Sequence, residues 1–257
     1  MIYVYFRITA FFLATSIIFP NGTPKLFKIC FSLLLSALLS AMIAINLEIN
    51  IPIENFYELI RYGVLETVNG LTMGYMVTIC FYSLKMAGKL IDGQMGLSMA
   101  STYDANTQSQ ATIMENLIYF VGVVVFFSIN AHYIIINSMQ NSFKIIPIGY
   151  SIIDYNFTYI LKVFTEYFMM GIKIAIPILV VLILTDLITG IISRSISGLN
   201  VMIVGMPLKM LVGILFFMSS LPFIVNTIKD ILKQLKNVIE GTLVYQDIMI
   251  ALINRLF

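Results

Sequence analysis

The sequence predicts an all-α integral membrane protein of about six long apolar helices. Of its 257 residues, 60% are apolar and 11% are charged, whereas a water-soluble domain has about 45–50% apolar and about 25% charged residues. Asp, Glu, Lys and Arg are absent from long stretches, among them 8–24, 29–47 and 116–143. These stretches are longer than a membrane-spanning strand and lack its alternation of apolar and polar residues, so they favour helices.

The charge-free stretches also give the order of the helices along a single predicted domain, residues 1–257. We expect helices near 3–19, 29–47, 65–87, 113–138, 169–192 and 207–228. Pro20 and the following Asn21-Gly22 end the first helix, because proline cannot donate to a helix and Asn-Gly favours a turn. The tail, 229–257, has apolar residues at helical spacing with charges between them, which predicts an amphipathic helix on the membrane or against a partner.

Small residues recur at the spacing of one helical turn in two of these helices. Ser32, Ser36 and Ser40 form one stripe, and Gly70 and Gly74 form a GxxxG pattern. Small residues let helix backbones approach closely in lipid, where the hydrophobic effect does not drive association. The two patterns fit packing within this chain, and they equally fit a seam for partner subunits.

Four ionisable residues, Glu66, Lys173, Asp186 and Arg194, lie within or at the edges of the apolar stretches. A charge at the centre of a bilayer costs several kcal/mol, so such residues usually pair or face a wet cavity. For Glu66 and Lys173 we hold two interpretations, a functional role and an extended side chain that reaches the membrane interface. For Asp186 we expect an internal partner, with Arg194 as the candidate after a turn.

Residues 85–115 are the least regular part of the sequence. Gly88, Gly93 and Gly96 interrupt a helical pattern, and the run from 101 to 110 is small and polar with Asp104 as its one charge. An exposed loop has this composition, and so does irregular backbone that lines or closes an aqueous path. The residues alone leave both interpretations open.

Signatures of catalysis and of cofactor binding are absent from the sequence. It has no phosphate-binding loop, no dinucleotide fingerprint, no HExxH and no Gly-x-Ser-x-Gly. Cys30 and Cys80 lie in apolar runs without metal-ligand spacing, and we interpret both as small core residues. His132 fits a helix-packing residue. We therefore predict no catalytic residue, no metal site and no cofactor.

Several motifs, in order along the chain, resemble the FliR/SctT family of type III export-apparatus proteins. They are Arg7, Pro20 and Pro24-Lys25, then Glu66 with Gly70 and Gly74, the stretch from Ala87 to Ala100, His132, Ser142-Phe143, Pro147-Ile148-Gly149, and finally Arg194, Leu199-Asn200 and Gly205-x-Pro207-Leu208-Lys209. The sequence departs from the family at Asp104-Ala105, commonly Asp-Pro, and at Ser197-Gly198, commonly Pro-Gln.

The resemblance implies a non-enzymatic subunit of the flagellar protein export gate. With FliP and FliQ it would form a hetero-oligomeric helical pore for unfolded flagellar proteins in the bacterial cytoplasmic (inner) membrane, at the flagellar basal body, with an FlhB-like protein as a further partner. Two alternatives remain, an SctT-type injectisome subunit and a stand-alone secondary transporter with Glu66, Lys173 and Asp186 as a charge relay. Because family assemblies lie partly above the bilayer, the apolar stretches are either crossings or helices buried in a protein ring.

The resemblance also implies where the gate would be closed. The family's pore plug corresponds here to Thr102, Tyr103, Asp104, Ala105, Asn106, Thr107, Gln108, Ser109, Gln110 and Ala111. The motif next to it corresponds to Asp92, Gln94, Met95, Gly96 and Met99. Methionine side chains are flexible and apolar, which suits sealing around a varied polypeptide.

Overall fold

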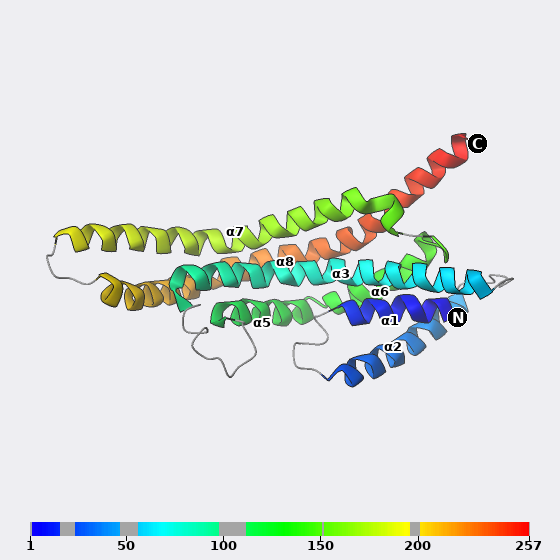
Figure 1. The fold of residues 1–257 in the computed structure, drawn as a ribbon, viewed down its shortest axis with the longest axis horizontal. Coiled ribbons are helices and arrows are strands. Elements are labelled where there is room, and N and C mark those ends of the chain that lie inside the picture. Colours follow the sequence, from blue (N-terminus) through cyan, green and yellow to red (C-terminus); the bar gives the residue numbers. More distant parts are fainter. Residues whose placement is uncertain are drawn as a thin grey trace. The chain divides into compact units, whose positions relative to one another are not determined.

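The computed structural model describes residues 2–15, 24–46, 56–97, 112–150, 152–195 and 201–256, and these residues are helical with short connections and without strands. The helices, drawn in Figure 1, are α1 (Ile2–Ala14), α2 (Lys25–Asn46), α3 (Phe56–Met95), α5 (Ile113–Ser128), α6 (Ala131–Ile145), α7 (Ile152–Ser195) and α8 (Val201–Leu256). The prediction of an all-α membrane protein is confirmed.

Within the described residues, three helical segments are long and apolar enough to cross a membrane, judged by length and composition. They are Phe56–Met95, Thr158–Arg194 and Gly205–Ile239, and α5 with α6 makes a fourth when the two count as one interrupted span. A crossing needs about 20 apolar residues, whereas α1 and the apolar part of α2, Leu26–Ala41, are shorter. The described residues therefore hold fewer full-length spans than the six apolar helices expected.

The helix expected over 113–138 is two helices in the structure. The chain leaves the helical conformation at Ile129, and Asn130 adopts the left-handed conformation with φ of 56°. Asparagine tolerates this conformation better than most residues because its short polar side chain bonds locally. Because the sequence on both sides of Asn130 is apolar, its composition did not indicate this break.

The last helices are longer than expected. α7 begins at Ile152 and contains Pro177, and α8 continues without interruption through residues 207–228 and into the tail. The amphipathic tail is thus the end of α8 and not a separate helix. Leu232, Leu235 and Ile239 are buried. The apolar face of α8 therefore continues into the part of the helix that also carries charged residues.

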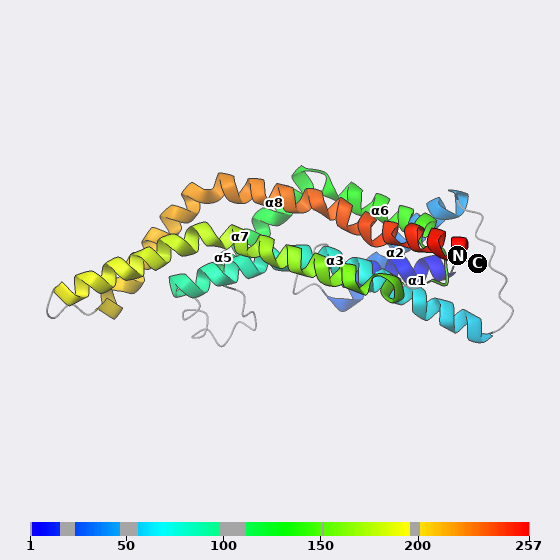
Figure 2. The same ribbon diagram turned by 90° about the horizontal axis from the view of Figure 1, so that it is seen from above.

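The helices form two compact units, each with its own buried side chains. The first contains Met1–Cys80, Asn130–Thr165 and Leu232–Phe257, and the second contains Phe81–Ile129 and Glu166–Ile231. In the first unit α1 runs along the first half of α3 (Figure 1, Figure 2), and Ile8, Phe11 and Met76 are buried. In the second, the ring of Phe81 lies edge-on to those of Tyr119 and Phe126, 6.0 and 5.7 Å away. The single domain stays a prediction.

Candidate functional site

The first unit contains a buried ion pair between α1 and α3. The side chains of Arg7 and Glu66 are both 0% exposed. Arg7 donates through Nε to Glu66 Oε2 at 2.5 Å and through Nη2 to Oε1 at 3.0 Å. Two parallel bonds between a guanidinium and a carboxylate are among the stronger polar contacts in proteins. Glu66 thus has an internal partner and does not reach toward an interface.

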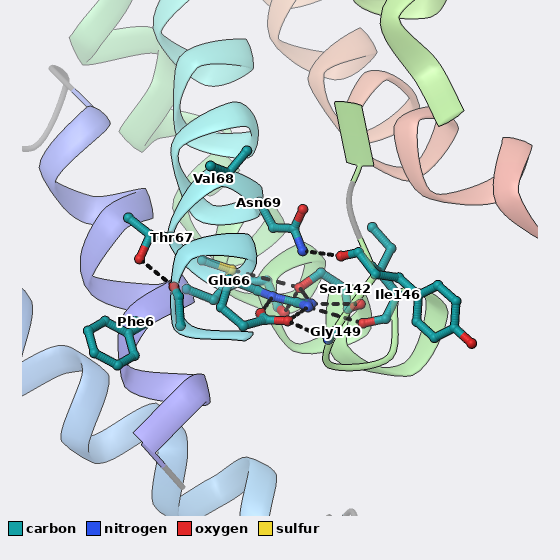
Figure 3. Close-up of polar contacts among 12 residues, drawn as sticks. Phe6, Glu66, Thr67, Val68, Asn69, Ser142, Ile146 and Gly149 are labelled. Atoms are coloured by element: carbon teal, nitrogen blue, oxygen red, sulfur yellow. Dashed lines mark hydrogen bonds and ion pairs between the residues drawn. The ribbon is translucent and has the colours of Figure 1, made fainter. Parts of the chain in front are cut away.

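The remaining polar groups of this pair bond to α6 and to the turn that follows it (Figure 3). Arg7 also donates to the carbonyl oxygens of Ser142 and Ile146, both at 3.1 Å, and the backbone N–H of Gly149 donates to Glu66 Oε1 at 3.3 Å. The Arg7 guanidinium lies 4.2 Å from the ring centre of Phe143. A buried pair is tolerated when such additional bonds satisfy its other donors and acceptors.

Glycine brings α1 and α3 close enough for this pair to form. A Cβ atom on Gly70 would lie 2.1 Å from the carbonyl oxygen of Arg7, and one on Gly74 would lie 2.6 Å from that of Phe11. The GxxxG face of α3 therefore packs on α1 of the same chain. This is one of the two arrangements that the sequence left open.

The serine stripe lies on the buried side of α2, which is a neighbour of α1. Ser32, Ser36 and Ser40 are at most 2% exposed, and each hydroxyl donates to a carbonyl of its own helix, three residues earlier. Cys30, in contrast, is exposed on the same helix, while Cys80 is buried. The prediction that both cysteines lie in the core is thus wrong for Cys30. A uniformly apolar helix does not reveal which side faces the protein.

In the second unit, the carboxylate of Asp92 caps the N-terminus of α5. Asp92 is 0% exposed. It accepts hydrogen bonds from the Thr112 hydroxyl and from the backbone N–H groups of Met114 and Glu115, at 3.2 and 3.0 Å. These N–H groups have no partner within the helix, and the N-cap residue, Thr112, makes no side-chain bond to them. A carboxylate 20 residues away in sequence thus caps the helix.

A glycine one turn before Asp92 makes this cap possible. A Cβ atom on Gly88 would lie 2.4 Å from the Cα atom of Glu115 and 2.7 Å from the carbonyl oxygen of Met114. The backbones of α3 and α5 therefore touch at Gly88. Residues 88 and 92 lie on the same face of a helix, so the close approach at Gly88 brings the α5 terminus to the Asp92 carboxylate.

A third polar contact joins α3, α7 and α8 in the second unit. Lys209 Nζ lies 2.7 Å from Asp186 Oδ2, and Gln94 Nε2 donates to the same oxygen at 3.1 Å. The expected pairing of Asp186 with Arg194 is wrong, since Lys209 is the partner. Arg194, on the last turn of α7, is exposed. Sequence distance favoured Arg194, whereas the packing of α8 on α7 decides the pair.

Some of the predicted residues take other positions or lie outside the described residues. Lys173 is exposed on α7, and Gly96, with φ of 80°, ends α3 in a conformation that favours glycine. Met99 and the predicted plug, 102–111, lie outside the residues that the structure describes. In the part of the chain that is described, no three residues of the types that commonly bind metals come together.

Sequence reasoning singled out Glu66, Asp92 and Asp186 but missed the residues that complete each contact. Arg7 was noted only as part of a family pattern, and Lys209 likewise. A signal for Arg7 was present, because it is the only charged residue before Lys25. A buried acid requires a base, but the sequence does not state which helices meet.

The fold and these contacts define an all-α membrane protein in which two acids of its apolar helices, Glu66 and Asp186, are paired inside the chain. Comparison with known proteins gives the particular family. The sequence model of the bacterial export proteins, family 1, matches residues 1–235. The chain belongs to this family, as the resemblance to FliR/SctT implied.

Three relatives illustrate the range of the family. The chain is 27% identical over 232 residues to the flagellar biosynthetic protein FliR of Bacillus subtilis, which covers 89% of this chain and 88% of the relative. The flagellar biosynthetic protein FliR of Escherichia coli is 24% identical, over 73% and 72% of the two chains. The secretion system apparatus protein SsaT of Salmonella typhimurium is 26% identical over 62% of each.

Proposed function

We propose that this protein is a non-enzymatic subunit of the flagellar type III protein export gate. With FliP and FliQ it forms the channel through which unfolded flagellar proteins leave the cell. The gate lies in the bacterial cytoplasmic membrane at the flagellar basal body, and an FlhB-like protein is a further partner. The observation that carries this proposal is the family match over residues 1–235, together with the flagellar names of the relatives.

The surfaces of α7 and α8 support a role inside a larger assembly. In the most apolar windows of these two helices, only 28% and 17% of the residues are buried within the chain. Ile183, Leu187 and Leu215 are half or more exposed. Exposed apolar areas of this extent are covered by lipid or by another protein. A subunit of a hetero-oligomeric membrane gate has such surfaces.

The plug of the gate is a further part of this proposal. We assign it to residues 102–111, with Asp92, Gln94, Met95, Gly96 and Met99 next to it. Shortening 102–111 is expected to raise the ion permeability of the assembled gate, because the segment would no longer fill the pore. An assembled gate that is no leakier than the wild-type gate would show that the plug lies elsewhere.

An injectisome subunit of the SctT type is the second candidate, and the similarity to SsaT supports it. The flagellar function is preferred because FliR relatives cover more of the chain. The charge relay of a secondary transporter has less support, since Glu66 is paired with Arg7 and Asp186 with Lys209. Paired and hydrogen-bonded charges are held in place by their partners.

Native mass spectrometry tests the proposed function directly. The chain would be tagged and co-expressed with the FliP and FliQ proteins from the same source, and the purified complexes would be weighed. We expect one defined hetero-oligomer that contains all three proteins. A monomer or homodimer of this chain, obtained while both partners are well expressed, would refute the gate and favour the transporter.

A further inference from the structure

An apolar groove of about 340 Å³ lies between α1 and α3 in the first unit. Its walls are the ring of Phe6 on α1 and one face of α3 from Leu59 to Val68. The ring lies over Gly63, where a Cβ atom would be 3.5 Å from it. Ile60 and Val64 are 49% and 57% exposed, so the groove is open on its outer side. Pockets that bind small molecules have volumes of about 300–1,000 Å³, and this groove is within that range.

We propose that this groove binds one acyl chain of a phospholipid, with the phosphate of the headgroup at Arg61. The inference goes beyond the export function and does not depend on it, because it requires only that the chain lies in a membrane. The ligand is an anionic phospholipid, since the charge at the site is positive.

The lining of the groove suits an apolar ligand. Thr67 is the one lining residue with a polar side chain, and its hydroxyl already donates to the carbonyl oxygen of Gly63 at 2.8 Å. Phe6 and Thr67 lie on one side of α3, whereas Glu66 turns to the other side, where Arg7 binds it (Figure 3). The groove therefore offers no hydrogen bond to a polar ligand, and an apolar chain loses none by entering it.

The length of the groove matches an acyl chain in one leaflet of a bilayer. Between Leu59 and Val68, α3 rises about 14 Å, at about 1.5 Å per residue. The hydrocarbon core of a bilayer is about 30 Å thick, so the chains of one leaflet cover about half of that distance. A helix with its side chains is about 10–12 Å wide, which is too wide to enter a groove of about 340 Å³. A single extended chain fits.

A positive charge lies at one end of the groove. Arg61 is exposed on α3 next to Ile60, and the side chains of a helix lean toward its N-terminus, which here is the end with Tyr57. Within the described residues Arg61 forms no ion pair, either with Glu58 or with another acid. A guanidinium binds phosphate through two parallel hydrogen bonds. Tyr57 is 75% exposed, and tyrosine is enriched at the level of lipid headgroups.

Native mass spectrometry of the full chain tests this site. The protein is purified in detergent, freed of lipid and titrated with dioleoylphosphatidylglycerol or with dioleoylglycerol, which has the same acyl chains but no phosphate. Val64→Trp fills the groove, and its matched control is Leu71→Trp, at an exposed apolar position of α3 outside the groove. Arg61→Gln removes the charge, and its matched control is Lys89→Gln, at an exposed position of the same helix.

We expect Val64→Trp to weaken binding of the first molecule of either lipid about tenfold, because the indole occupies the space of the acyl chain. Arg61→Gln is expected to weaken binding of phosphatidylglycerol about tenfold, which corresponds to about 1.4 kcal/mol, and to leave binding of dioleoylglycerol unchanged. Arg61→Lys keeps the charge and should retain most of the affinity for phosphatidylglycerol. Both controls should bind each lipid as the wild type does. Melting temperatures without lipid establish that the variants are folded.

Equal affinities of Val64→Trp and Leu71→Trp for phosphatidylglycerol would overturn the inference, and the groove would then be a surface for another occupant, such as a partner subunit. Equal affinities of Arg61→Gln and Lys89→Gln would overturn it as well, because the phosphate would not be at Arg61. Since Arg61 is exposed, its variants are expected to fold. If Val64→Trp does not fold, the comparison of Arg61→Gln with Lys89→Gln decides alone.

Discussion

Arg7 and Glu66 would each be costly to bury alone, but as a pair they form a structural contact. Each residue alone would be an unpaired charge in an apolar helix, yet together they satisfy two backbone carbonyls and one backbone N–H. The pair joins α1, α3 and α6, which are far apart in sequence. Removing one partner of such a pair leaves a buried charge, which is more damaging than removing both.

Replacing Glu66 with Leu is therefore expected to lower the stability of the chain by about 3–5 kcal/mol. The buried Arg7 would lose its counter-charge while keeping its desolvation cost. The melting temperature of the detergent-purified protein measures this effect. Arg61→Gln, at an exposed position of the same helix, is the control and should change the melting temperature little.

The double variant Arg7→Met with Glu66→Leu should be more stable than Glu66→Leu alone. A lower melting temperature for the double variant would contradict this account.

Gly70→Ala tests the contact between α1 and α3. The added methyl group would lie 2.1 Å from the carbonyl oxygen of Arg7, so we expect a loss of about 1–3 kcal/mol from overpacking. Gly190→Ala is the matched control, because a Cβ atom there meets nothing within 4 Å. Equal melting temperatures for the two variants would mean that α1 does not pack on this face of α3.

At the scale of elements, local sequence features predicted that each segment is helical, but they did not predict where every helix begins and ends. The break between α5 and α6 depends on one backbone conformation at Asn130, within a stretch that is apolar on both sides. The continuity of α8 shows the opposite case, since charged residues after 228 did not end the helix. Packing of a buried side overrides the change in composition, because tertiary contacts contribute most of the stability of a helix.

Asn130→Gly and Asn130→Val test whether residue 130 must adopt the left-handed conformation. Glycine adopts positive φ readily, so we expect the first variant to match the wild type. The second should lose about 1–2 kcal/mol, because a β-branched residue is strained in the left-handed region. Melting temperatures of the two purified variants measure the difference. If valine were tolerated as well as glycine, α5 and α6 would form one helix in solution.

At the scale of the molecule, α7 and α8 carry many exposed apolar side chains. Ile183 and Leu187 on α7 and Leu215 on α8 are half or more exposed. The chain is thus incomplete as a water-facing body and requires lipid or partner subunits around it. The need for cover follows from how the helices pack, because packing decides which face of each helix stays exposed.

Cysteine labelling in native membranes tests this cover. We expect Ile183→Cys and Leu215→Cys, introduced into a Cys30→Ser, Cys80→Ala background, to resist a membrane-impermeant maleimide until detergent is added. Thiols surrounded by lipid or protein are not reached by a water-soluble reagent, and the thiolate that reacts is disfavoured there. A cysteine at exposed Lys144 is the comparison position. Equally rapid labelling at positions 183 and 144 would show that the α7 face is open to water.

The sequence by itself determined the class of this protein and some of the acids in its polar contacts, but not their partners. Composition and charge-free length are local properties, and they are sufficient to predict apolar helices and to mark Glu66 and Asp186 as acids within or at the edges of apolar stretches. The resemblance to the family likewise depends only on the identity and order of residues along the sequence. None of these inferences requires knowing which helices touch.

Only the tertiary structure decided the partners. Arg7 lies 59 residues from Glu66, and Thr112 lies 20 residues from Asp92. Asp186 bonds to Lys209 on the next helix, although Arg194 is closer in sequence. An ion pair forms between groups that packing brings together, and packing depends on where Gly70 and Gly88 allow two backbones to meet. A sequence states that a buried charge must be neutralised, and the three-dimensional arrangement selects the residue that neutralises it.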